Sequence, residues 1–139
     1  MINHLIGFHP SFGLLTMRIV LGTIFILHGY TKLLKKNGRQ QISGVPAPEM
    51  MTTIIGMVEF LGGIFIAAGF YTRLAAAANV ITIFVTVLIM KKTVSTTPPM
   101  EKKWAGGYEL AVALGTMALI LVMMGAGKFS LDVIILNEW

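Results

Sequence analysis

The chain has 139 residues, of which 55% are hydrophobic and only 12% are charged, and its formal net charge is +5. A soluble domain usually carries about a quarter of its residues as charged ones, and a chain this short cannot bury so much apolar surface in water. A water-soluble fold is therefore excluded, and the absence of cysteine also excludes thiol chemistry, cysteine metal ligands and disulfides.

Four long apolar segments predict an all-α integral membrane protein, folded as an antiparallel four-helix bundle. They cover about residues 12–32, 51–71, 74–90 and 107–124. A helix of about 20 apolar residues crosses the hydrocarbon core, and about 17 is near the lower limit. Because four spans use most of the chain, residues 1–139 are expected to form a single domain. The first segment has no basic stretch before it and no small-residue cleavage site after it, so we expect a retained helix and not a signal peptide.

The first segment carries Arg18 in its apolar part and His28 and Lys32 towards its end. At about 100° per residue, these three side chains fall within roughly 80° of one helix face. A charge at bilayer depth costs several kcal/mol unless it is paired or faces a cavity. We therefore expect this face of the first helix to turn into the bundle.

The second and fourth segments each contain one glutamate, Glu59 and Glu109. Each of these two helices also carries a row of small residues, and such rows allow helices to approach closely. The glutamates should thus lie near helix contacts and not in lipid. The helical rise places Glu59 near the bilayer centre, Glu109 level with His28, and Arg18 towards the outer side. The small residues are Gly63, Ala67, Ala111 and Gly115.

Three interpretations of these polar residues are open. In the first, they form an internal ion-pair network, with Glu59 contacting Arg18 or His28, and Glu109 contacting His28 or Lys32. In the second, they line a pocket that binds a small ligand such as a quinone headgroup and relays protons. In the third, His28, Glu59 and Glu109 hold a metal ion, although no Glu-x-x-His motif supports a di-iron bundle.

The basic residues predict the orientation in the membrane. Eight lysines and arginines lie in the first and third loops, whereas only Arg73 and Lys128 lie on the other side. The positive-inside rule then places loops one and three in the cytoplasm and both termini outside. This distribution argues against nucleic acid as a partner and is also compatible with binding of anionic lipid headgroups. The eight are Lys32, Lys35, Lys36, Arg39, Lys91, Lys92, Lys102 and Lys103.

Arg73 and Asp132 are expected on the outer side of the membrane. Arg73 follows the turn after the second segment, and Asp132 follows the fourth segment. A structural charge pair between them would clamp the C-terminal tail over the outer end of the bundle. The alternative is two solvated charges that contribute almost nothing together.

Several stretches together resemble the DoxX family. RIVLGTIFILHGYTKLL resembles its first helix, EFLGGIFIAAGFYTRLAA its second, and YELAVAL and GAGKFSLD its fourth helix and Gly-x-Gly-x-x-Ser-x-Asp ending. The resemblance covers about residues 12–133 and implies a four-helix protein of a bacterial or archaeal cytoplasmic membrane. Relatives include the membrane subunit of a thiosulfate:quinone oxidoreductase and a subunit of an oxidoreductase complex of oxidative-stress defence. Many members have no established activity, and shared fold does not transfer a reaction.

The resemblance leaves two functions of different classes. One is the membrane subunit of a quinone-linked redox complex, with a redox partner protein and a pocket lined by Arg18, His28, Lys32, Glu59 and Glu109. The other is a non-enzymatic scaffold or small-solute carrier, in which the same charges only fix helix packing. The lipid bilayer is a partner in both, and both are compatible with a homo-oligomer. A pocket that reaches Glu59 would favour the first, and a dry ion pair the second.

Overall fold

The computed structural model of the chain describes residues 10–34, 41–42, 45–46, 48–96 and 108–136. The elements are the helices α1 (Pro10–Leu34), α2 (Glu49–Ala68), α3 (Thr72–Thr96) and α4 (Tyr108–Met124), with a short π-helical turn, η3 (Asp132–Leu136), after α4. Between α1 and α2, the strands β1 (Gln41–Ile42) and β2 (Val45–Pro46) pair antiparallel, with Gln41 opposite Pro46. The sequence did not predict this small ladder.

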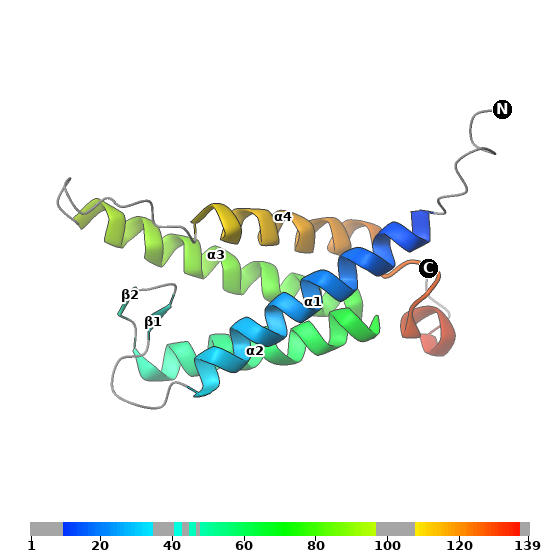
Figure 1. The fold of residues 1–139 in the computed structure, drawn as a ribbon, viewed down its shortest axis with the longest axis horizontal. Coiled ribbons are helices and arrows are strands. Elements are labelled where there is room, and N and C mark those ends of the chain that lie inside the picture. Colours follow the sequence, from blue (N-terminus) through cyan, green and yellow to red (C-terminus); the bar gives the residue numbers. More distant parts are fainter. Residues whose placement is uncertain (1–9, 35–40, 43–44, 47, 97–107, 137–139) are drawn as a thin grey trace.

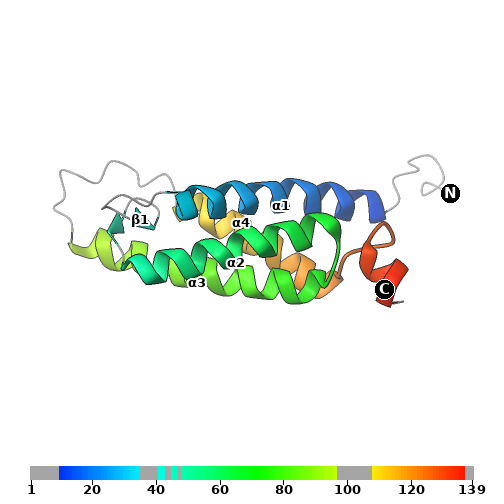
Figure 2. The ribbon, with the colours of Figure 1, turned by 90° about the horizontal axis from the view of Figure 1, so that it is seen from below.

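The four helices form an antiparallel bundle, as the sequence predicted. Figures 1 and 2 show them side by side along one long axis, with successive helices running in opposite directions. We call the end where α1 and α3 finish and α2 and α4 begin the loop end. The opposite end holds the α2–α3 turn, the end of α4 and η3, and we call it the tail end (Figure 1).

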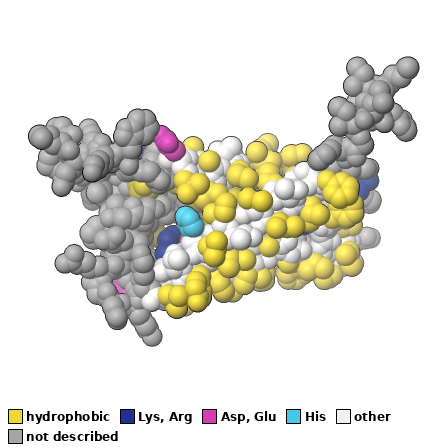
Figure 3. Space-filling model, viewed as in Figure 1, with side chains coloured by type: hydrophobic (Ala, Val, Ile, Leu, Met, Phe, Trp, Pro, Cys, Tyr) yellow, Lys and Arg dark blue, Asp and Glu magenta, His cyan; other side chains and the backbone are white. Residues whose placement is uncertain are grey.

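The helices of the bundle have the length and the apolar outer surface of membrane-spanning helices. Three helical stretches, Ser11–Leu34, Glu49–Ala68 and Thr72–Lys91, are long and apolar enough to cross a membrane, and Glu109–Met124 is a shorter apolar helix. Figure 3 shows hydrophobic side chains over most of the described part of one face. Soluble monomers rarely expose so large an apolar surface. The chain is therefore a multi-pass membrane protein whose sides are covered by lipid.

The turn between α2 and α3 depends on Gly69. This residue adopts a left-handed conformation (φ 72°, ψ 38°), and its N–H and that of Phe70 bond back to Ile66 O and Phe65 O at 3.1 and 2.9 Å. Glycine adopts this conformation without the penalty that a Cβ atom brings. The second helix consequently ends at Ala68, three residues before the predicted boundary.

Glycines set how α1 packs on α2. A Cβ atom added at Gly29 would lie 2.5 Å from the Phe60 nitrogen, and one at Gly22 would lie 2.7 Å from the Gly63 oxygen. Only residues without side chains let two helix backbones come this close. These contacts fix the register of the antiparallel pair, with Gly22 beside Gly63 and Gly29 beside Gly56.

The apolar core lies around the middle of the bundle and extends towards the tail end. Its buried members come from the middle of α1, the end of α2, the first half of α3, and the middle and end of α4. No charged residue belongs to this cluster among the described residues. The most completely buried members are Leu21, Ile66, Ala76, Ala118 and Leu121.

Candidate functional site

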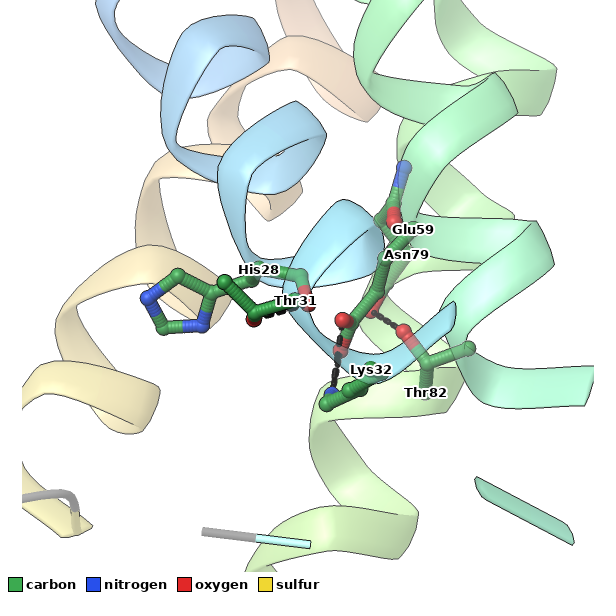
Figure 4. Close-up of polar contacts among 6 residues, drawn as sticks. All are labelled: His28, Thr31, Lys32, Glu59, Asn79 and Thr82. Carbon is green, nitrogen blue, oxygen red and sulfur yellow. Dashed lines mark hydrogen bonds and ion pairs between the residues drawn. The ribbon is translucent and has the colours of Figure 1, made fainter. Parts of the chain in front are cut away.

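A buried ion pair joins α1 to α2. The Nζ atom of Lys32 lies 2.6 Å from both carboxylate oxygens of Glu59, and the two side chains are only 11% and 5% exposed. The close contact of Gly29 with Gly56, one turn from each partner, lets the two side chains meet between the helices (Figure 4). Within the described part of the chain this is the one ion pair.

The partner of Glu59 differs from the expected one. The sequence predicts that Glu59 pairs with Arg18 or His28 and that Glu109 pairs with His28 or Lys32, whereas the structure pairs Lys32 with Glu59. Arg18 lies fourteen residues from Lys32 on α1, which is about 21 Å along the axis. Side chains on a helix lean towards the N-terminus of their helix. The Lys32 side chain therefore points back to the level of Glu59. The midpoints of the apolar segments could not reveal this register.

Arg18 belongs to a separate site at the tail end. It is 1% exposed, and its Nη2 donates a hydrogen bond to the Phe129 carbonyl oxygen. The carboxylate of Asp132 is close enough to attract its charge. The guanidinium also packs against Gly69, where any Cβ atom would collide with Nη1. Arg18 therefore anchors the segment after α4 and does not line a common pocket with Lys32 and Glu59.

Asp132 holds the same segment against the start of α3. Its two carboxylate oxygens accept hydrogen bonds from the backbone N–H groups of Tyr71 at 2.5 Å and Thr72 at 3.0 Å. A carboxylate at the beginning of a helix satisfies free N–H groups and interacts well with the helix dipole. The expected ion pair between Arg73 and Asp132 is not present among the described residues: Arg73 is exposed, and the Asp132 carboxylate is bonded to backbone N–H groups. The tail is clamped, but through backbone donors that have no sequence signature.

His28 and Glu109 lie apart from the ion pair. His28 is exposed, and its ring points away from Glu59 in Figure 4. Glu109 is exposed in the first turn of α4. The expected metal set of His28, Glu59 and Glu109 is not brought together, because the described residues contain no group of three potential metal ligands. Figure 3 shows histidine and basic side-chain atoms together near the loop end.

A row of buried polar residues on α3 was not predicted from the sequence. Asn79, Thr82 and Thr86 are buried on one helix face, at intervals of three and four residues. Thr82 Oγ1 donates to Asn79 O at 2.8 Å, and Asn79 Nδ2 donates to Ala75 O at 3.1 Å. Figure 4 shows Glu59, Asn79 and Thr82 gathered between α2 and α3. The signal in the sequence is the helical spacing of one amide and two hydroxyl side chains within a segment that has no charged residue.

An apolar groove runs between α2 and α3 on the outside of the bundle. It has a volume of about 630 Å³, and its walls include Ile55 and Val58 from α2 and Ile81 from α3. Thr82 also lines it, so the groove reaches the polar row. Glu59 lies one residue beyond Val58 and is not part of the lining. The groove thus ends beside the ion pair without opening onto it.

These features define a multi-pass helical membrane protein with one buried ion pair and a clamped C-terminal segment. The model of the DoxX family matches residues 13–92. This is more than half of the chain, and the protein therefore belongs to the DoxX family. No solved structure matches it.

Three relatives cover nearly the same length as this chain. It is 25% identical to "Putative oxidoreductase CatD" of Bacillus subtilis, over 86% of this chain and 84% of the relative. It is 29% identical to an uncharacterized protein of Haemophilus influenzae, over 94% and 95%. It is 27% identical to inner membrane protein YqjF of Escherichia coli, over 91% and 95%. One of these relatives is named an inner membrane protein, and another carries an oxidoreductase name.

Proposed function

We propose that this protein is the membrane subunit of a quinone-linked redox complex. The observation that carries the proposal is the buried pair of Lys32 and Glu59 beside an apolar groove of about 630 Å³. Ionisable residues inside a membrane are costly and mark functional sites by default, and ligand sites are mostly apolar clefts of about 300–1,000 Å³ with few polar groups. The oxidoreductase name of the Bacillus subtilis relative supports the same class.

In the proposed complex the apolar tail of the quinone occupies the groove, between Ile81 and Val58. Its headgroup lies at Thr82, which lines the groove and neighbours the ion pair. Reduction of the quinone consumes protons, and Glu59 delivers one of them while Lys32 orients the Glu59 carboxylate. Arg18, His28 and Glu109, which the sequence placed in the same pocket, are not part of this ligand site.

The proposal includes a location and a partner. The basic residues favour loops one and three in the cytoplasm, and the Escherichia coli relative is named an inner membrane protein. We place this chain in the cytoplasmic membrane of a prokaryote with that orientation. A redox partner protein supplies the electrons, because the chain has no cysteine with which to carry sulfur chemistry.

A non-enzymatic scaffold is the second candidate, and two observations favour it: the groove does not open onto Glu59, and the ion pair is closed. Both oxygens of Glu59 are bonded by Lys32 at 2.6 Å without any ligand. A closed ion pair of this kind can have a purely structural role. It then fixes the register of two helices in a membrane, where apolar packing alone does little to orient one helix against another. The two candidates differ in whether a quinone binds.

Quinone binding is tested by thermal stabilisation of the purified protein in detergent. A ligand that binds only the folded protein stabilises it by about 2.7 kcal/mol at a hundred times its Kd. We expect decylubiquinone or a short-chain menaquinone to raise the Tm of the wild type. The rise should disappear in Glu59→Gln, which removes the proton-delivering carboxylate, and in Ile81→Trp, which fills the groove.

Phe84→Trp is the matched control, because Phe84 is an exposed apolar residue on the same helix outside the groove. This variant should keep the full rise in Tm. If neither quinone raises the Tm of the wild type, or if all three variants keep the rise, the scaffold function replaces the redox function.

A further inference from the structure

Three buried side-chain oxygens on α3 have no hydrogen-bond partner among the described residues. One is Thr72 Oγ1, in the first residue of the helix. The other two, Oδ1 of Asn79 and Oγ1 of Thr86, lie further along the helix in residues that are 0% and 5% exposed. Nearly all buried polar atoms in proteins are hydrogen-bonded to protein or to ordered water. In the middle of a membrane helix the need is greater, because lipid offers no hydrogen bonds. Buried water molecules could supply the missing hydrogen bonds to these two atoms.

Oδ1 of Asn79 and Oγ1 of Thr86 lie along the axis on either side of the Glu59 carboxylate. Gly62 packs directly against the Asn79 side chain, and since α2 and α3 are antiparallel, Glu59 is level with Thr82. Thr86 is then about one turn nearer the loop end, at the level where the Lys32 Cβ packs near Gly56. Asn79, Thr82 and Thr86 share one face of α3 and span about 10 Å. They form a polar row that passes the carboxylate.

Thr82 of this row also lines the apolar groove, but along the helix axis the row leads out only towards the loop end. At the loop end, Lys32 lies two residues before the end of α1 and keeps 11% of its side chain exposed. At the tail end, the row meets the apolar core, where Leu21, Ile66 and Ala76 are all 0% exposed. A water chain could therefore reach Glu59 past Lys32 and Thr86, but could not continue beyond Asn79.

We infer that the polar row of Asn79, Thr82 and Thr86 carries a one-sided water path from the loop end to Glu59. Water enters beside Lys32, bonds to Thr86 Oγ1, passes the carboxylate and ends at Asn79 Oδ1. Protons reach and leave Glu59 along this path from the loop side. The apolar core seals the path from the tail side, so the bundle does not leak protons across the membrane.

This inference deepens the proposed function, because it names the side from which protons reach Glu59, the proposed proton donor. It does not depend on which ligand binds, since the path consists of residues of this chain. Its test therefore measures access of water and not redox activity, and the quinone experiment can fail while this one succeeds.

The chain has no cysteine, so single cysteines can report access without background. Thr86→Cys and Asn79→Cys mark the two ends of the path, and Ala76→Cys is the matched control, equally buried on α3 but in the apolar core. Full-length variants are reconstituted in vesicles and exposed to Ag⁺, a thiol reagent small enough to follow a file of waters. Thiols left free are then labelled with a maleimide after denaturation. Glu49→Cys and Lys128→Cys, both exposed, report the loop side and the tail side.

Ag⁺ added from the loop side should nearly abolish later labelling of Thr86→Cys and Asn79→Cys and leave Ala76→Cys fully labelled. Ag⁺ added from the tail side should protect none of the three. Each variant is first shown to keep the wild-type Tm, and if one of the two path variants fails, the other decides. The inference is overturned if the path cysteines are labelled as fully as Ala76→Cys, or if Ag⁺ protects them from the tail side.

Discussion

Lys32 and Glu59 satisfy each other in a place where neither charge is stable alone. The pair is nearly closed to solvent, since the two side chains are only 11% and 5% exposed. Removing one partner from such a pair leaves a buried, uncompensated charge, which costs more than removing both. The pair therefore couples α1 to α2 more strongly than its single contact suggests.

We expect Glu59→Gln and Lys32→Met to destabilise the protein by about 3–5 kcal/mol each. The double variant should be more stable than either single variant, because it leaves no unpaired charge. Unfolding in mixed detergent micelles, followed by helical circular dichroism, measures the coupling in a double-mutant cycle.

Glu109→Gln is the control for this cycle, because Glu109 is an exposed carboxylate with no ion pair among the described residues. Its effect should be within about 0.5 kcal/mol, and it should add to that of Lys32→Met. Additive effects of Glu59→Gln and Lys32→Met would show that the two residues are not coupled.

At the scale of elements, the contact between α1 and α2 is a backbone contact. Gly22 and Gly29 of α1 face Gly63 and Gly56 of α2, and no side chain separates the helices there. In a membrane, close packing of this kind replaces the hydrophobic effect as the force that joins helices. The ion pair lies one turn away, so the glycines also decide whether it can form.

Gly29→Ala should separate the two helices. The added Cβ atom would lie 2.5 Å from the Phe60 nitrogen and 2.6 Å from the Gly56 oxygen, and both are backbone atoms that cannot turn aside. We expect a loss of about 1–3 kcal/mol from overpacking, and a further loss if the ion pair opens. The same unfolding measurement in detergent detects it.

The same substitution at Gly13 is the matched control, because nothing lies within 4 Å of a Cβ atom there. Gly13→Ala should be neutral or stabilise α1 by up to about 1 kcal/mol through its higher helix propensity. Equal effects of the two substitutions would mean that the close contact does not hold the helices.

The helices themselves could be predicted from sequence because hydropathy and length determine them. Apolar segments of the right length predicted α1 to α4 within a few residues, except that α3 continues to Thr96, beyond its apolar part. A scan for apolar residues cannot find the end of a helix that extends past the membrane. The small β-ladder between α1 and α2 was not predicted for a related reason, since two-residue strands show no periodicity in the sequence.

At the scale of the whole molecule, the sequence indicated which charges are largely buried better than it indicated their partners. A charge at bilayer depth or at a helix end requires a partner or a polar cavity. This requirement singles out Arg18, Lys32, Glu59 and Asp132. Their partners depend on the register of α1 on α2 and on the path of the chain after α4. Register follows from backbone contacts between glycines, and the tail is held by backbone groups. Neither is encoded in the spacing of charged residues.

The C-terminal segment is the element that closes the tail end of the bundle. It reaches α1 through the bond from Arg18 to Phe129 O, and reaches the α2–α3 turn through Asp132, whose N–H also donates to Gly69 O at 2.8 Å. Few other polar contacts hold it, and Lys128 is exposed at its start. Local opening of such a segment costs less free energy than unfolding of the bundle.

Asp132→Ala should release the C-terminal segment while leaving the bundle folded. The variant loses both hydrogen bonds to the start of α3, a capping loss of about 1 kcal/mol or more, and it also removes the charge that faces Arg18. We expect trypsin to cut after Lys128 several-fold faster than in the wild type, with little change in the Tm of the helices. Asp132→Asn keeps an acceptor for the Tyr71 N–H and should be cut at an intermediate rate. Mass spectrometry of the released peptide measures the rate, and equal rates in Asp132→Ala and the wild type would show that Asp132 does not hold the segment.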